Sequence, residues 1–239
     1  MKIIICKDYA EMSEKGAAFI AAELKQKPDL VLGLATGSTP VGMYAELAKK
    51  YQKGEISFKA VTTVNLDEYY PIEPTNDQSY RHFMNKNLFD QIDIDKANTH
   101  VPCGTAKDPA AEGARYEKLI DSLGGIDVQV LGIGQNGHIG FNEPAQALVM
   151  DTHVTDLTES TIRANSRFFA SENDVPRRAL TMGMGSIFKA RKVLLLISGK
   201  EKKTAVKALL SRALTTASPA TLLNLHPDVT LFCTEDAIQ

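Results

Sequence analysis

The sequence predicts an α/β fold in which helices cover both faces of an open, mostly parallel β-sheet. Short runs rich in Val, Ile and Leu alternate with longer segments of helical periodicity, which is the pattern of repeated βαβ units. Several of these short runs are continuously apolar, as expected for strands covered on both sides. The 239 residues contain no internal repeat or linker. We therefore expect one domain, residues 1–239, with a Rossmann-like arrangement.

The predicted strands are the short apolar runs at residues 2–6, 30–34, 61–66, 128–133, 193–198 and 230–233. The predicted helices lie between them, at residues 9–25, 41–53, 110–123 and 201–214. Residues 146–178 have the least regular periodicity, and we expect them to form a lid or an insertion.

Composition limits the classes of partner. The 27 Lys and Arg residues nearly balance the 29 Asp and Glu residues, and the net charge of -2 predicts no general attraction to nucleic acid or to an anionic membrane. Any anion must therefore be held by a local site. Three cysteines without metal-ligand spacing favour a reducing compartment, and the N-terminal residues do not resemble a signal peptide. We expect a cytoplasmic protein.

Ligands of open parallel sheets bind beyond the carboxyl ends of the strands, so the segments after each strand are the candidate sites. The first is residues 33–40, with the sequence GLATGSTP. Gly37 frees the backbone, Thr39 is a candidate helix N-cap and Pro40 suits the first helical position. Free amides and small hydroxyls at a helix N-terminus suit a phosphate. Ser38 would offer both an amide and a hydroxyl there. The segment lacks the Gly-Lys-Ser/Thr of a Walker A loop, and a capped turn without a ligand remains the alternative.

The second segment places two adjacent acids, Asp67 and Glu68, at the end of a predicted buried strand. Such a carboxylate is a helix cap, a metal ligand or a base. No cluster of His or Cys lies nearby in the sequence, which argues against a transition-metal site. A solvated cap remains the alternative to a base.

The third segment, residues 131–144, contains a G-x-G-x-x-G pattern at Gly132, Gly134 and Gly137. A dinucleotide site would need a helix to begin there, with Asp156 near the expected position of a ribose-binding acid. Residues 138–144 read HIGFNEP, and their Gly and Pro argue against such a helix. A flexible loop that presents His138 and Glu143 fits general acid/base chemistry better, because a carboxylate can orient an imidazole.

The fourth set is basic. Lys200, Lys202 and Lys203 follow a predicted strand, and Arg163 and Arg167 lie in the irregular region. Most charge runs are solvated helix faces, but a lysine or arginine at this edge of the sheet can reach the same phosphate as residues 37–39. The four segments together predict a small phosphorylated substrate that faces one carboxylate and a His-carboxylate pair. Proton transfer on a sugar phosphate, or its hydrolysis, requires no cofactor motif.

These motifs resemble the glucosamine-6-phosphate deaminase family. The resemblance rests on the first loop, on residues 65–69 (NLDEY), on residues 137–144 (GHIGFNEP), on residues 164–169 (ANSRFF), and on the Ser-Pro-Ala and Leu-His-Pro near the C-terminus. The HIGFNEP string is highly specific, and the matches run in order from about residue 30 to residue 235.

The resemblance implies conversion of glucosamine 6-phosphate and water to fructose 6-phosphate and ammonia without a metal or another cofactor. It implies that His138 opens the sugar ring, that Asp67 moves a proton from C2 to C1, and that Glu143 orients His138. With an ordinary pKa near 4, Asp67 would be ionised at pH 7. The implied phosphate ligands are Gly37, Ser38, Thr39, Arg167 and Lys202.

The chain departs from the family pattern in two ways. Many members have Asp at the position of Asn136, and an amide can hold an imidazole by a hydrogen bond but cannot stabilise its cation by charge. We therefore expect Glu143 to be the main charged partner of His138. Residues 145–155 also lack the basic residues of members that N-acetylglucosamine 6-phosphate activates, and the chain stops at Gln239. We expect no such activation, and a monomer or a small homo-oligomer.

Two other functions remain open from the sequence. The 6-phosphogluconolactonase family shares the fold and the first loop, but typically has Asp-Glu-Arg where this chain has Asp67, Glu68 and Tyr69. A non-catalytic sugar-phosphate-sensing domain is the second alternative. It would need a DNA-binding module, and the sequence has no basic helix-turn-helix.

Overall fold

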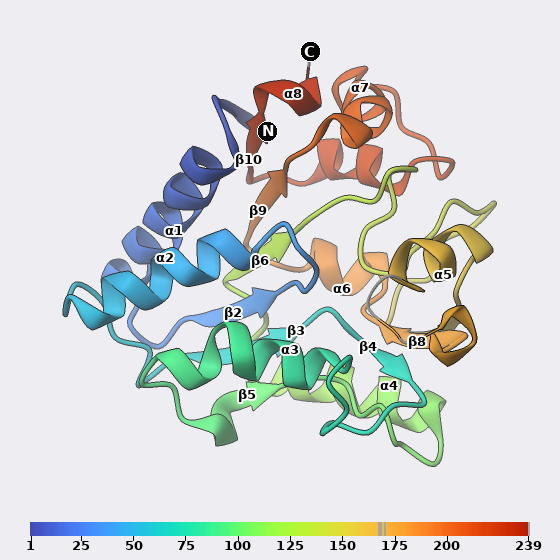
Figure 1. Ribbon diagram of the computed structural model, residues 1–239, viewed down its shortest axis with the longest axis horizontal. Coiled ribbons are helices and arrows are strands. Elements are labelled where there is room, and N and C mark those ends of the chain that lie inside the picture. Colours follow the sequence, from blue (N-terminus) through green and yellow to red (C-terminus); the bar gives the residue numbers. More distant parts are fainter. Residues whose placement is uncertain (167–168, 170, 239) are drawn as a thin grey trace.

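The computed structural model describes residues 1–166, 169 and 171–238. Its centre is a seven-stranded sheet with the strand order β1-β10-β9-β6-β2-β3-β5 (Figure 1), in which every pairing is parallel. The strands are β1 (Lys2–Cys6), β2 (Val31–Leu34), β3 (Thr62–Asn65), β5 (Thr99–His100), β6 (Val128–Leu131), β9 (Lys192–Ile197) and β10 (Val229–Thr234). The predicted α/β class with a mostly parallel sheet is confirmed.

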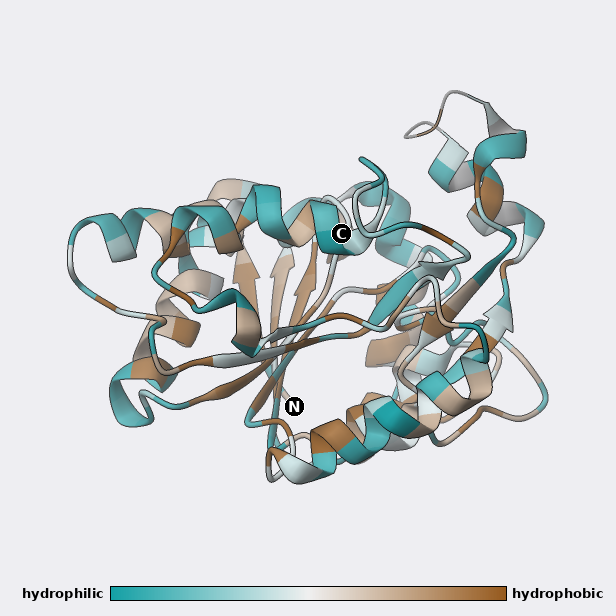
Figure 2. Ribbon diagram, turned by 90° about the horizontal axis from the view of Figure 1, so that it is seen from below, coloured by the Kyte–Doolittle hydropathy of each residue, from teal (hydrophilic) through white to brown (hydrophobic). Residues whose placement is uncertain are grey.

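The interior strands are buried because their residues are apolar on both faces. All residues of β2, β6 and β10 are buried, whereas the edge strand β1 exposes Ile3 and Ile5. In Figure 2 the strands run through the middle in hydrophobic colours, and helices with hydrophilic outer faces lie on both sides of them. The sheet and the helices that pack on it therefore share one extended apolar core.

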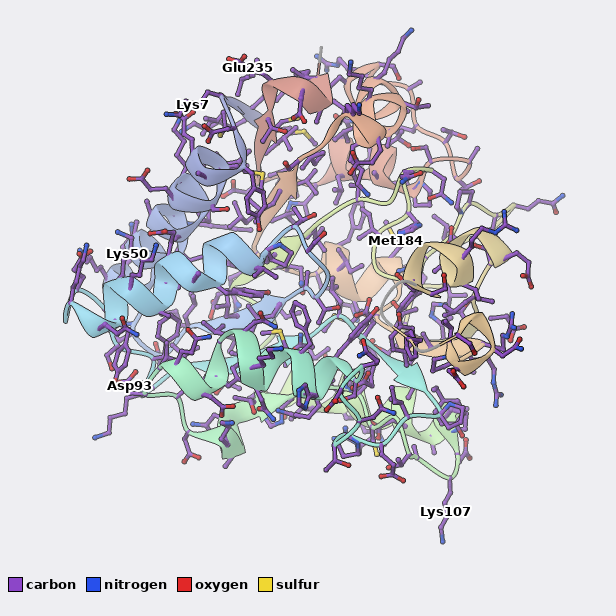
Figure 3. All side chains as sticks on the ribbon, viewed as in Figure 1. Lys7, Lys50, Asp93, Lys107, Met184 and Glu235 are labelled. Carbon is purple, nitrogen blue, oxygen red and sulfur yellow. The ribbon has the colours of Figure 1, made fainter. Side chains whose placement is uncertain are left out.

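The helices are α1 (Tyr9–Gln26), α2 (Val41–Gln52), α3 (Tyr80–Asn87), α4 (Pro109–Ser122), α5 (Glu159–Asn165), α6 (Met184–Phe188), α7 (Lys203–Leu210) and α8 (Glu235–Ile238). Side-chain oxygens of Asp8 and Asp108 cap α1 and α4. Helix α2 packs between α1 and α3 as one layer. Labelled charged side chains such as Lys7, Lys50 and Glu235 lie on the outer rim (Figure 3). No helix in the described part of the chain is long and apolar enough to cross a membrane.

The sequence analysis missed several short elements. A second, antiparallel sheet has the order β4-β8-β7, formed by β4 (Asp67–Tyr70), β7 (His153–Asp156) and β8 (Arg178–Thr181). Residues 146–178 are thus more regular than predicted, since they contain β7, α5 and a short 3₁₀ helix, Glu172–Asp174. The helix predicted at residues 201–214 is shorter, because a 3₁₀ turn (Lys200–Lys202) precedes α7. The prediction that Thr39 caps α2 is also wrong: Pro40 occupies that position without a side-chain hydrogen bond.

The strand order contains one reversal that matters for function. After β2 the chain adds β3 and β5 on one side, and then adds β6, β9 and β10 on the other. The connections after β2 and β6 therefore leave the sheet in opposite directions. Open α/β sheets bind their ligands at such a point.

Candidate active site

The four predicted segments are placed by the order of the strands that precede them. The strands β9, β6, β2 and β3 are consecutive neighbours, so the segments that follow their carboxyl ends lie along one edge of the sheet. The segment after β3 is additionally joined to β2, since the Leu66 amide donates to the Leu34 carbonyl at 3.0 Å. This strand order supports the choice of the four segments as candidate sites.

The loop after β6 is shaped around its histidine. The imidazole of His138 lies against Gly134, where a β carbon would come within 2.2 Å of the ring. Gly137 and Gly140 have positive φ angles of 83° and 57°, which side chains other than glycine rarely adopt. No helix begins in this loop, so the dinucleotide alternative is wrong, and Asp156 lies exposed in β7.

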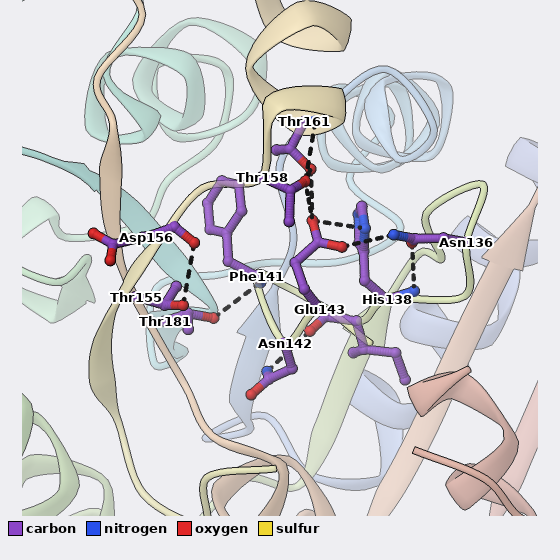
Figure 4. Close-up of polar contacts among 11 residues, drawn as sticks. Asn136, His138, Phe141, Asn142, Glu143, Thr155, Asp156, Thr158, Thr161 and Thr181 are labelled. Atoms are coloured by element: carbon purple, nitrogen blue, oxygen red, sulfur yellow. Dashed lines mark hydrogen bonds and ion pairs between the residues drawn. The ribbon is translucent and has the colours of Figure 1, made fainter. Parts of the chain in front are cut away.

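A carboxylate and an amide accompany the imidazole, as Figure 4 shows. His138 Nδ1 lies 3.3 Å from Glu143 Oε1 in an ion-pair contact. Asn136 Nδ2 donates to Glu143 Oε2 at 2.7 Å, and Asn136 Oδ1 accepts from the backbone amide of His138 at 3.2 Å. The amide thus holds the carboxylate and the loop backbone, whereas the sequence analysis expected it to hold the imidazole.

Two threonines that the sequence analysis did not single out complete the surroundings of Glu143. Thr161 Oγ1 donates to Glu143 Oε1 at 2.5 Å, and Thr158 Oγ1 lies 3.5 Å from the same oxygen. Burial alone would raise the pKa of Glu143, but contacts with His138, Thr161 and Asn136 outweigh it and lower this pKa to about 2. Glu143 therefore stays ionised beside the imidazole at neutral pH.

Asp67 faces the same loop from the antiparallel sheet. It opposes Thr181 in the pairing of β4 with β8, and Thr181 Oγ1 accepts a hydrogen bond from the Phe141 amide at 3.1 Å. A methyl group on Gly140 would lie 2.9 Å from Thr181 Oγ1 and 3.5 Å from Asp67 Oδ2. Strand β8 therefore fixes the distance between the Asp67 carboxyl and the loop that carries His138.

The Asp67 carboxyl is buried and accepts no hydrogen bond within the described ranges of the chain. Burial, with a smaller contribution from the charge of Glu68, raises the pKa of Asp67 to about 8. The expectation of an ordinary pKa near 4 is wrong for the unliganded protein, because that value assumed access to water. At pH 7 the side chain is mainly protonated.

Glu68 has a different task. Its carboxylate accepts hydrogen bonds from the amides of Tyr80 at 2.8 Å, of Arg81 at 3.0 Å, and of Tyr69 at 2.9 Å. Two of these amides belong to the first turn of α3, where a negative charge is favourable. Burial raises the pKa of Glu68, and the three amides counteract part of this effect. Of the two adjacent acids, Glu68 thus binds the first-turn amides of α3, whose N-cap is Ser79, whereas Asp67 makes no such contact among the described residues.

The loop after β2 exposes Gly37 and Ser38. Gly37 adopts a φ of 87°, and a side chain there would meet no atom within 4 Å. The Tyr9 hydroxyl donates to the Ser38 carbonyl at 2.9 Å and accepts from the Gly42 amide at 2.8 Å. This phenol bridges the two ends of the loop, and the sequence analysis missed it because Tyr9 lies far away in the sequence.

The predicted basic groups are placed only in part. Lys202 is half-buried in the 3₁₀ turn that precedes α7, whereas Lys200 and Lys203 are exposed. Arg167 lies outside the described residues. Within the described part, no group of three or more His, Cys, Asp or Glu residues is arranged to hold a metal ion.

Strand β8 and the residues after it connect the parts of the site. The Met182 amide donates to the Leu66 carbonyl at 2.7 Å, and Asn142 Nδ2 donates to the Met182 carbonyl at 2.8 Å. Met184 then donates its amide to the Val149 carbonyl at 2.9 Å. One short stretch thus contacts the Asp67 segment, the His138 loop and the start of residues 146–178.

Comparisons with known proteins agree with this geometry. Residues 8–232 match the model of a family described as glucosamine-6-phosphate isomerases/6-phosphogluconolactonase. The glucosamine-6-phosphate deaminase of Clostridium perfringens is 54% identical over 237 residues, which cover 99% of this chain and 98% of that protein. The enzyme of the same name from Halothermothrix orenii is 53% identical, with the same coverage.

Solved structures show the same relationship. A structure described as a monomeric glucosamine-6-phosphate deaminase of the NagB superfamily superposes with a TM-score of 0.97 at 47% identity, covering 99% of this chain and 98% of that one. The 6-phosphogluconolactonase of Thermotoga maritima superposes with a TM-score of 0.77 at 22% identity, covering 98% and 99% of the two chains, which establishes the shared fold alone. The chain therefore belongs to the family of glucosamine-6-phosphate isomerases and 6-phosphogluconolactonases.

Proposed function

We propose that this protein converts glucosamine 6-phosphate and water to fructose 6-phosphate and ammonia. The observation that carries the proposal is the buried Asp67 carboxyl, which has no hydrogen-bond partner among the described residues and lies beside the loop of His138 and Glu143. Relatives of full length at 54% and 53% identity are named glucosamine-6-phosphate deaminase, in agreement with it.

In this proposal Asp67 removes the proton from C2 of the open-chain sugar and returns it to C1. The base must be ionised to do so, although Asp67 is mainly protonated in the unliganded protein. The cationic amino group on C2 of the substrate favours the carboxylate form, because an opposite charge within a few ångströms lowers the pKa of an acid. Substrate binding would thus activate the base at the carbon where it is needed.

His138 supplies the proton transfers that open the sugar ring. Its imidazole lies 3.3 Å from the ionised Glu143, which stabilises the imidazolium that forms after His138 accepts a proton. Asn136 supports this step indirectly, since it fixes the second oxygen of Glu143.

The phosphate lies at the far end of the substrate in this scheme. We assign it to Gly37, Ser38 and Thr39 before α2, with Arg167 and Lys202 as basic partners. The position of these residues before the N-terminus of α2, which has no side-chain cap, supports the assignment, as does the half-buried position of Lys202 compared with its exposed neighbours. Binding energy at the phosphate would orient C1 and C2 toward Asp67 without taking part in the chemistry.

We further propose that residues 1–239 act as one catalytic unit in the cytoplasm, as a monomer or a small homo-oligomer, with residues 146–178 as a lid over the substrate. The monomeric relative at 47% identity supports the monomer. The contact of α5 with Glu143 supports the second, because α5 lies within these residues.

Purified protein should release ammonia and fructose 6-phosphate from glucosamine 6-phosphate, and Asp67→Asn should not. Incubation with 6-phosphogluconolactone in parallel tests the lactonase alternative, which is less supported because lactonase structures share only the fold. Absence of ammonia, or full activity of Asp67→Asn, would overturn the proposal.

A further inference from the structure

We infer that Thr161 is a positioning residue for the reaction proposed above: its hydroxyl holds the Glu143 carboxylate in the orientation that faces His138. The inference rests on the proposed function, and it assigns Thr161 no contact with substrate. It concerns a residue of α5, which lies outside the loop that carries the other members of the group (Figure 4).

The geometry places the two contacts on one oxygen. Thr161 Oγ1 and His138 Nδ1 both approach Glu143 Oε1, at 2.5 Å and 3.3 Å. The other oxygen, Oε2, is held from the opposite side by Asn136 at 2.7 Å. A carboxylate with a donor on only one oxygen can turn about its last side-chain bond, whereas donors on both oxygens fix its plane. Removal of the Thr161 hydroxyl would leave this oxygen with the longer contacts of His138 at 3.3 Å and Thr158 at 3.5 Å, which hold it less firmly.

The start of α5 fixes the Thr161 hydroxyl in turn. Thr158 is the N-cap, and its oxygen accepts from the Thr161 amide at 3.3 Å. The same Thr158 hydroxyl donates to Thr161 Oγ1 at 3.0 Å. Because Thr161 Oγ1 accepts this bond, its own hydrogen points to Glu143. The Thr158 hydroxyl also lies 3.5 Å from Glu143 Oε1, which is a longer contact than that of Thr161.

The burial of Thr161 strengthens the effect of its hydrogen bond to Glu143. Only 7% of Thr161 is exposed, so water cannot replace its hydroxyl freely. A hydrogen bond from a hydroxyl to a carboxylate is stronger than one between neutral groups. It also favours the ionised form of Glu143, which is the form that can stabilise an imidazolium.

Three variants test the inference by kinetics. Thr161→Val keeps the size of the side chain and removes the hydroxyl, and we expect kcat to fall about tenfold with KM within about twofold. Thr161→Ser keeps the hydroxyl and should retain most of the activity. Thr155→Val is the matched control in the same region, since among the described residues the Thr155 hydroxyl makes one hydrogen bond, to the Asp156 carbonyl at 3.4 Å. Equal losses of activity in Thr161→Val and Thr161→Ser, or no loss in Thr161→Val, would overturn the inference.

A second measurement does not depend on the reaction. Carbon-13 NMR of labelled Glu carboxyls, assigned with Glu143→Gln, should show that the pKa of Glu143 rises by about 1 in Thr161→Val and not in Thr155→Val. An unchanged titration of Glu143 would contradict the positioning role. If the unmodified protein releases no ammonia, the proposed function fails, while this titration still decides whether Thr161 holds Glu143.

Discussion

Asp67 and Glu143 are two carboxyl groups of one site with opposite surroundings. Asp67 is buried with no hydrogen-bond donor among the described residues, and its pKa is raised to about 8. Glu143 is also largely removed from water, yet its contacts lower its pKa to about 2. Burial raises the pKa of both groups. The two pKa values differ because Glu143 has hydrogen-bond donors and the charge of His138 beside it, whereas Asp67 has the like charge of Glu68 nearby. Pairs of acids with pKa values pushed apart are a way to assign different catalytic tasks to the same functional group.

The largest effect should follow from removal of the unpaired acid. We expect Asp67→Asn to lower kcat about 10³-fold, because a general base is lost, while substrate still binds. Rates of ammonia release at saturating substrate and direct binding measurements would check both parts. Loss of binding together with activity would mean that Asp67 serves structure and not proton transfer.

The same variant should be more stable than the parent at pH 8. The folded-state pKa of Asp67 exceeds its unfolded value near 3.9, so the folded protein binds more protons, and its stability falls as pH rises from about 4 to 8. An amide has no proton to lose, and we expect the melting temperature of Asp67→Asn to exceed that of the parent by a few degrees at pH 8 and by less at pH 5. An equal difference at both pH values would contradict the raised pKa.

Substitution of Glu143 tests the role of the second carboxyl group. Glu143→Gln keeps the shape but removes the charge beside His138, and we expect kcat to fall about 10²-fold. Asn136→Ala removes one hydrogen bond to the carboxylate and should cost less than about fivefold. Steady-state kinetics of both variants would decide, and the opposite order would show that the amide matters more than the charge.

The pH dependence sharpens the comparison further. Because kcat/KM reports the ionisation of the free enzyme, it should fall as pH decreases below about 8, by up to about tenfold per pH unit, as Asp67 becomes protonated. Carbon-13 NMR of Asp carboxyls, with Asp67→Asn for assignment, would locate the titration directly. A titration of Asp67 below pH 5 would contradict this expectation.

The smallest effect is expected far from both carboxyls. Tyr9→Phe removes the hydroxyl that bridges Ser38 and Gly42, and should raise KM about threefold to fivefold with kcat unchanged, because the loop loses two hydrogen bonds but no reacting group. Kinetics with and without competing inorganic phosphate would measure the change. A fall in kcat with an unchanged KM would contradict a role of Tyr9 in shaping the phosphate loop.

Much of the fold was predictable because its signals are local. The apolar runs of β2, β6 and β10 marked strands, and the segments that follow parallel strands must meet at one edge. The antiparallel sheet was missed because its strands have four residues each and no alternation; β4, for example, reads DEYY. Such strands exist through pairing with distant residues, which a single segment does not reveal.

The site was predictable to a similar degree. The positions of His138 and Glu143 in a glycine-rich loop indicated their proximity, and the structure places them 3.3 Å apart. The pKa of Asp67 and the contact of Thr161 with Glu143 depend on packing between segments far apart in sequence. The start of a helix at Thr158 could have been recognised from the acidic residue that follows it. The contact between this helix and the Glu143 carboxylate could not have been recognised in the same way.

The stretch from Thr181 to Met184 determines which parts of the site a shift of strand β8 would displace. It is hydrogen-bonded to the Leu66 carbonyl, to Asn142 and to the Val149 carbonyl, and Thr181 opposes Asp67. The Asp67 carboxyl and the loop that carries His138 therefore share a common register. A shift of β8 by one residue would misalign both at once, so the ring-opening and isomerisation steps would be lost together and not one after the other.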